Sequence, residues 1–144
     1  ICSSLFPAII NAKLTDVKVY KKRLSNLYVL MFILSLIIAI TITFLAKPIM
    51  TVLFGNNYLE SVAILKIYIW SSVGLFLSVA VNQYLISENS VKTIFWFNFL
   101  SMIINIGLNI WLIPLIGLLG AAWATLISYF VIPVSIFVRE KFFR

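Results

Sequence analysis

The feature that most constrains this chain is a run of 23 consecutive residues, 24–46, without a single charged side chain. A helix of about 20 apolar residues crosses the hydrocarbon core of a bilayer. Three more apolar runs follow at residues 61–87, 91–113 and 117–138. The composition agrees, because 63% of the residues are hydrophobic and 10% are charged, against about 45–50% and 25% in soluble domains. The sequence therefore predicts an all-α, polytopic membrane protein with four transmembrane helices.

The composition also excludes several classes of function. A chain this apolar cannot be a soluble enzyme or a nucleic-acid-binding domain, because its surface would aggregate in water. It has no His and one Cys, which removes imidazole metal sites, internal disulfides and thiolate metal cages. All four acidic residues lie at the ends of the apolar runs, so no carboxylate pair is placed for acid–base chemistry. We expect no enzyme activity, no catalytic residue, no metal and no cofactor.

The boundaries of the apolar runs divide the chain into three parts. Residues 1–12 are too short to cross a membrane, so we expect residues 1–23 to hold the end of a truncated upstream helix and a basic linker. Residues 24–138 form the membrane part, and residues 139–144 form a tail. Lys47 and Pro48 are expected to end the first span, since the residue before a proline avoids the helical region.

The positions of the basic residues predict the orientation in the membrane. The segment before the first span carries five basic residues against one acidic residue, and the tail carries three against one. Four spans return the chain to the side from which it started, and an excess of Lys and Arg marks the cytoplasmic side. We therefore expect both ends of this segment in the cytoplasm. The basic excess is explained by topology and by anionic lipids, so membrane lipids are expected partners and nucleic acid is not.

Two polar features inside the apolar runs are candidate functional residues. Lys66 either lines a cavity and meets an anionic group such as a phosphate, or extends its stem back to the membrane interface. Asn98, Asn105 and Asn109 lie with Ser101 at steps of three, four and four residues, which places them on one helix face. That face either hydrogen-bonds a sugar-bearing substrate or joins neighbouring helices.

The order of motifs along the chain is similar to that of a known family. The matching elements are Phe6-Pro7, Asp16, Lys47-Pro48-Ile49, Leu53-Phe54-Gly55 with Tyr58, Asn105 with Leu108-Asn109, and Leu112-Ile113-Pro114 followed by Gly117, Gly120-Ala121-Ala122 and Ala124-Thr125. In this order they resemble the C-terminal part of the polysaccharide-export flippases. These proteins are the O-antigen and capsule lipid-linked-oligosaccharide transporters of the multidrug/oligosaccharidyl-lipid/polysaccharide superfamily. The resemblance covers nearly the whole chain.

The resemblance implies a two-lobed fold around a central cleft, in which these four helices form the end of the second lobe. It implies a bacterial inner-membrane protein that flips undecaprenyl-pyrophosphate-linked O-antigen or capsule units to the outer face by alternating access. Lys66 would then meet the pyrophosphate, and Asn98, Asn105 and Asn109 would line the cleft. The implied partners are the lipid-linked oligosaccharide, membrane lipids, a glycan polymerase and chain-length proteins.

Two alternative functions remain open for this sequence. One is a multidrug exporter or other lipid exporter of the same superfamily. The other is a four-helix membrane scaffold of a glycan-synthesis complex. Because a single half-lobe cannot enclose a cleft between two lobes, we expect the chain to be a fragment of the transporter.

Overall fold

The computed structural model describes residues 16–55, 58–59 and 61–142, so the predicted end of an upstream helix at residues 1–12 lies outside the described residues. The described residues fold into helices, which are α2 (Val17–Phe54), α3 (Ser61–Tyr68), α4 (Ser71–Ser87), α5 (Val91–Ile116) and α6 (Leu118–Phe142). Because α3 and α4 together make one span, four helical stretches are long and apolar enough to cross a membrane. The prediction of an all-α protein with four transmembrane helices is confirmed.

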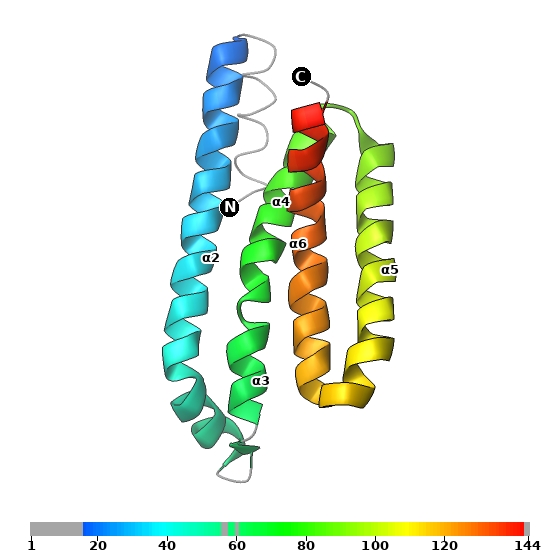
Figure 1. The fold of residues 1–144 in the computed structure, drawn as a ribbon. Coiled ribbons are helices and arrows are strands. Elements are labelled where there is room, and N and C mark those ends of the chain that lie inside the picture. Colours follow the sequence, from blue (N-terminus) through cyan, green and yellow to red (C-terminus); the bar gives the residue numbers. More distant parts are fainter. Residues whose placement is uncertain (1–15, 56–57, 60, 143–144) are drawn as a thin grey trace.

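The helices stand side by side in a layer. Figure 1 shows their order as α2, then α3 and α4, then α6, then α5. The last helix in the sequence therefore lies between α4 and α5, and α5 packs mainly against α6 at the edge of the layer. Consequently α5 has no buried residue, whereas α2, α4 and α6 supply the buried core.

The first helix, α2, begins earlier and ends later than the apolar run predicts. The side chain of Asp16 caps its start by accepting a hydrogen bond from the backbone N–H of Lys18 at 2.7 Å. The expectation that Lys47 and Pro48 end the helix is wrong, because α2 continues through Pro48 to Phe54. A proline removes one backbone hydrogen bond and bends a helix without having to end it, and the last turns of α2 bend toward α3 (Figure 1). Gly55, with φ at +82°, ends the helix.

The second span is interrupted between α3 and α4. Ile69 and Trp70 form a turn at this point. The N–H groups of Trp70, Ser72 and Val73 each donate to a carbonyl three residues earlier, at 3.0–3.2 Å, which is the tighter spacing of a 3₁₀ turn. The Ser71 hydroxyl donates to the Tyr68 carbonyl at 2.6 Å and satisfies a group that the interruption leaves open. Tyr68 is therefore the last residue of α3 and stands at a defined break inside the membrane span.

Glycine allows α6 to approach both of its neighbours closely. A Cβ atom added at Gly74 of α4 would lie 2.9 Å from the carbonyl carbon of Tyr129 in α6. A Cβ atom added at Gly120 of α6 would lie 2.5 Å from the carbonyl oxygen of Leu112 in α5. Small residues at helix contacts are the usual means of close packing in lipid, where apolar burial between helices provides little driving force. Gly74 and Gly120 thus hold α4, α6 and α5 together as a tight group.

Larger apolar side chains form the contacts in the half of the layer near the start of α2, beside a pocket of about 1090 Å³ lined by α2, α4 and α6. Two clusters of buried residues lie there, one formed by Tyr20, Leu27, Met31 and Ala80, and the other by Val81, Leu85, Ile132 and Ile136. They join the first half of α2 to α4, and α4 to the second half of α6. This end of the bundle is packed by bulky apolar groups, and the polar side chains of α5 and α6 lie outside both clusters.

Candidate functional site

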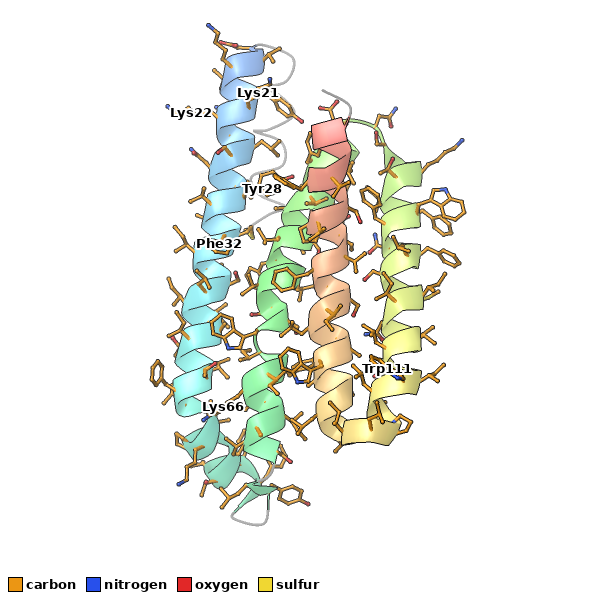
Figure 2. The ribbon with its side chains drawn as sticks, viewed as in Figure 1. Lys21, Lys22, Tyr28, Phe32, Lys66 and Trp111 are labelled. Atoms are coloured by element: carbon orange, nitrogen blue, oxygen red, sulfur yellow. The ribbon has the colours of Figure 1, made fainter. Side chains whose placement is uncertain are left out.

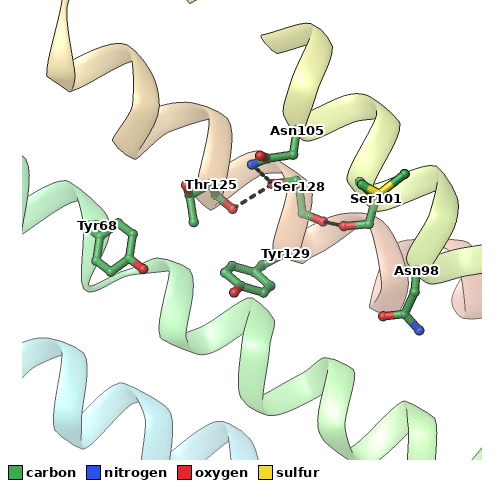
Figure 3. A pocket seen from close by; sticks show the side chains of 8 residues that line it. Tyr68, Asn98, Ser101, Asn105, Thr125, Ser128 and Tyr129 are labelled. Atoms are coloured by element: carbon green, nitrogen blue, oxygen red, sulfur yellow. Dashed lines mark hydrogen bonds between the residues drawn. The ribbon is translucent and has the colours of Figure 1, made fainter. Parts of the chain in front are cut away.

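A polar cavity of about 390 Å³ lies where the end of α3 meets α5 and α6 (Figure 3). Its lining consists of Tyr68, Asn98, Ser101, Met102, Asn105, Thr125, Ser128 and Tyr129. At 1.5 Å per residue, Asn105 lies about 21 Å along α5 from Val91, so the cavity sits at middle depth in the span. The described residues that line it include amides, hydroxyls and phenols, and none of them carries a charge.

Hydrogen bonds between α5 and α6 form the floor of this cavity. The Ser101 hydroxyl donates to the Ser128 carbonyl at 2.7 Å, and the Asn105 amide donates to the Ser128 hydroxyl at 2.8 Å. The Ser128 hydroxyl in turn donates to the Ala124 carbonyl at 2.6 Å. The amide of Asn109 donates to the Asn105 side-chain oxygen at 3.0 Å. These bonds hold Asn105 in one orientation and give the floor a fixed shape.

The structure brings together some of the predicted site residues and separates others. Asn98 and Asn105 both line the cavity, on the face that the spacing along α5 predicts. Asn109 lies one turn further along and acts on the cavity through its hydrogen bonds to Asn105. Lys66 is exposed on α3 and is not part of the lining (Figure 2). The amide row is therefore one structural unit, and Lys66 is separate from it.

Sequence reasoning missed the contributions of α3 and α6 to this cavity. Thr125 and Ser128 each lie four residues after an alanine, and in the sequence this spacing is typical of close helix packing. Their hydroxyls do bond to the carbonyls one turn earlier, and Ser128 also binds α5. No sequence pattern marks Tyr68 and Tyr129 as site residues, because only the packing of α3 and α6 against α5 brings them to the cavity.

A second hydrogen-bonded cluster joins helices at the end of the layer where α2 begins. The buried Tyr20 hydroxyl donates to the Glu88 carboxylate at 2.9 Å and lies 2.7 Å from the Ser87 hydroxyl. Because 67 residues separate Tyr20 from Ser87 in sequence, this contact ties the first turns of α2 to the connection between α4 and α5. The cluster fixes the height of α2 relative to the end of α4 in the membrane.

The fold and the cavity together define a multi-pass helical membrane protein with hydrogen-bonding groups facing a space inside the membrane. A family model described as "Lipid II flippase MurJ" matches residues 1–141. The chain therefore belongs to the lipid II flippase MurJ family, whose proteins are transporters rather than enzymes, and it is a multi-pass protein of the inner membrane. This confirms the superfamily of lipid-linked flippases that the sequence motifs indicate. No curated protein and no solved structure gives a significant match.

Proposed function

We propose that this chain forms part of a transporter that flips lipid II, the lipid-linked precursor of peptidoglycan, to the outer face of the inner membrane by alternating access. The observation that carries the proposal is the family match, which extends over residues 1–141 of the 144-residue chain. The family match does not support the O-antigen or capsule specificity predicted from the sequence motifs. Lipid II therefore replaces those units as the proposed cargo, and the four helices are proposed to belong to the second lobe.

The chemistry of the cavity supports a lipid-linked glycan as cargo. The head group of such a lipid must cross a hydrocarbon core about 30 Å thick, in which polar groups have no water to bind. Asn105 presents its amide at middle depth in the span, and Asn98 lies about 10 Å from Val91. We assign both residues to contacts with the head group. Asn109 is assigned to orienting Asn105. Lys66, exposed on α3, is the candidate partner of the pyrophosphate, because a cation inside a span is costly unless it serves an anion or reaches the interface.

The charge distribution supports cytoplasmic N- and C-terminal ends. The first turns of α2 carry Lys18, Lys21, Lys22 and Arg23. They lie at the same end of the layer as the end of α6 and the first turn of α5, which carries Lys92 (Figure 1). Basic residues collect on the cytoplasmic side. In this orientation α3 begins at the outer face, where a glycan polymerase is the proposed consumer of the flipped lipid.

A reconstitution assay tests the proposed function. The transporter that contains this chain is placed in liposomes that contain lipid II, and the head group exposed on the opposite leaflet is measured with an impermeant reagent over time. We expect faster exposure than in protein-free liposomes, and slower exposure of an O-antigen lipid. Exposure of lipid II at the protein-free rate would contradict transport, and equal rates for the two lipids would contradict lipid II specificity.

The role of Lys66 is tested in the same assay. Replacing Lys66 with Gln removes its charge while keeping much of its length, so we expect a lower initial rate of lipid II exposure. The matched control is Lys47→Gln, because Lys47 is an exposed lysine that follows the uncharged run of residues 24–46, whereas Lys66 lies within the run of residues 61–87. Equal rates for Lys66→Gln and the unsubstituted protein would remove Lys66 from the site.

A further inference from the structure

Three polar groups at the rim of the 390 Å³ cavity have no hydrogen-bond partner within the described part of the chain. They are the hydroxyls of Tyr68 and Tyr129 and the side-chain oxygen of Asn98, whose amide nitrogen donates to the Ile94 carbonyl at 2.7 Å. The three side chains come from α3, α6 and α5. Figure 3 shows the ring of Tyr68 directed toward Tyr129, with Asn98 at the other end of the lining. The rim thus differs from the floor, where Ser101, Asn105 and Ser128 are hydrogen-bonded to one another.

Free polar groups at this depth need a partner. A polar group that faces lipid without a hydrogen bond costs free energy, because the hydrocarbon offers no donor or acceptor. Two other atoms of the described residues, Ser72 Oγ and Asn82 Oδ1, are buried without a partner, but neither residue lines this cavity. The rim of the cavity is distinct, because it gathers two donor–acceptor hydroxyls and one acceptor around a single open space.

The residues that line the cavity indicate which chemical class of ligand it can bind. Since no described charged residue lines the cavity, it offers nothing to neutralise a pyrophosphate. Tyrosine combines an apolar ring with a polar hydroxyl, and a sugar ring correspondingly combines C–H faces with a rim of hydroxyls. The volume of about 390 Å³ lies within the range of roughly 300–1,000 Å³ found for small-ligand sites.

We propose that this cavity is a subsite for the sugar part of the lipid-linked head group, with hydrogen bonds from Tyr68 and Tyr129 at one end and from Asn98 at the other. The inference rests on the proposed function, because it assigns the sugar part of that substrate to the cavity and leaves the pyrophosphate to another part of the site. The fixed floor formed by Ser101, Asn105 and Ser128 makes the subsite pre-organised, which lowers the cost of binding. The Ser71 hydroxyl bound to the Tyr68 carbonyl at 2.6 Å likewise holds the end of α3 in place.

A binding experiment on the full chain in lipid nanodiscs tests this assignment. The dissociation constants of lipid II and of undecaprenyl pyrophosphate, which carries the lipid and the pyrophosphate but no sugar, are measured for each variant. For Tyr68→Phe and Tyr129→Phe we expect the Kd of lipid II to rise roughly two- to tenfold for each hydrogen bond lost. The Kd of undecaprenyl pyrophosphate should stay unchanged. The control Tyr58→Phe removes the same hydroxyl from an exposed tyrosine that contacts Phe54, and it should change neither constant.

The outcomes separate this inference from the proposed function. A double variant, Tyr68→Phe with Tyr129→Phe, that binds lipid II as tightly as the unsubstituted protein would overturn the subsite. An equal loss of affinity for both lipids would also overturn it, because the effect would not depend on the sugar. If the unsubstituted protein binds lipid II in the sugar-dependent way but fails the liposome assay, the subsite stands and the proposed transport fails. If it transports lipid II while the double variant shows no sugar-dependent loss, transport stands and the subsite fails.

Discussion

The close approach of α4 and α6 at Gly74 gives a sharp prediction of stability. A Cβ atom at this position would lie 2.9 Å from the carbonyl carbon of Tyr129 and 3.0 Å from Cδ2 of Phe130. Carbon atoms in contact prefer about 3.5–4.0 Å, so Gly74→Ala must move the two helices apart by about 0.5–1 Å. The hydrogen bond from the Ser78 hydroxyl to the Tyr129 carbonyl, now 3.1 Å, would then lengthen beyond its useful range.

Two opposing contributions set the change in unfolding free energy that Gly74→Ala should cause. Overpacking of a close contact costs about 1–3 kcal/mol, whereas alanine is favoured over glycine inside a helix by about 1 kcal/mol. Gly107→Ala provides a matched control, because a Cβ atom added at Gly107 would meet no atom of another helix within 4 Å. The gain in helix propensity is common to both variants, so the difference between them, about 1–3 kcal/mol, isolates the contact between α4 and α6.

Reversible unfolding of the purified protein in mixed micelles measures this difference, with intrinsic tryptophan fluorescence as the signal. We expect Gly74→Ala to unfold at a lower denaturant concentration than Gly107→Ala, with the unsubstituted protein between them or close to Gly74→Ala. Equal stability of the two alanine variants would refute the close packing of α4 against α6 and the geometry of the cavity that depends on it.

Three further substitutions test other contacts. Gly120→Ala should destabilise the hairpin of α5 and α6 more than Gly74→Ala does, because the added Cβ would meet the Leu112 carbonyl oxygen at 2.5 Å; the same unfolding assay checks this. Ser128→Ala removes the acceptor for one hydrogen bond from α5 and should cost about 0.6–1.7 kcal/mol of unfolding free energy in the membrane. Tyr20→Phe removes the bond to Glu88 at 2.9 Å and should increase hydrogen exchange in the first turns of α2, with no change in α5.

The number and type of the spans could be predicted from the sequence, since backbone groups in lipid must be paired within a helix. The ends and interruptions of the helices could not. Pro48 lies inside α2, because a proline in a long span bends the helix while the flanking turns keep their hydrogen bonds. The break at Ile69 and Trp70 contains neither glycine nor proline, so no local residue marks it. The sequence pattern therefore predicts spans well and breaks poorly.

Only part of the candidate site could be predicted, because spacing along one helix can be read from the sequence but the rotation of one helix against another cannot. The spacing of Asn98 and Asn105 places them on one face of α5, and both line the cavity. The position of Lys66 depends on the rotation of α3, which the sequence alone leaves open. Lys66 and Tyr68 are two residues apart, so they point about 200° apart around the helix. Since Tyr68 faces the cavity, Lys66 must face another direction, and a charge inside a span is thereby separated from the amide row.

The hydrogen bonds of the membrane part show why polar residues alone do not mark a binding site. Most hydroxyls of the described spans bond to a carbonyl of their own helix, as Thr43 and Thr125 do at 2.7 and 2.9 Å. Three bonds that cross between helices in the middle of the layer end on α6, at Ser128 or Tyr129. In both kinds of bond the polar side chain has a hydrogen-bond partner within the protein, so these residues stabilise the fold.

A binding site requires polar groups that the fold leaves without a partner. In the cavity these groups are the phenol of Tyr68, the phenol of Tyr129 and the oxygen of Asn98. The chemistry of those three groups, rather than the number of polar residues in the spans, is what points to a sugar.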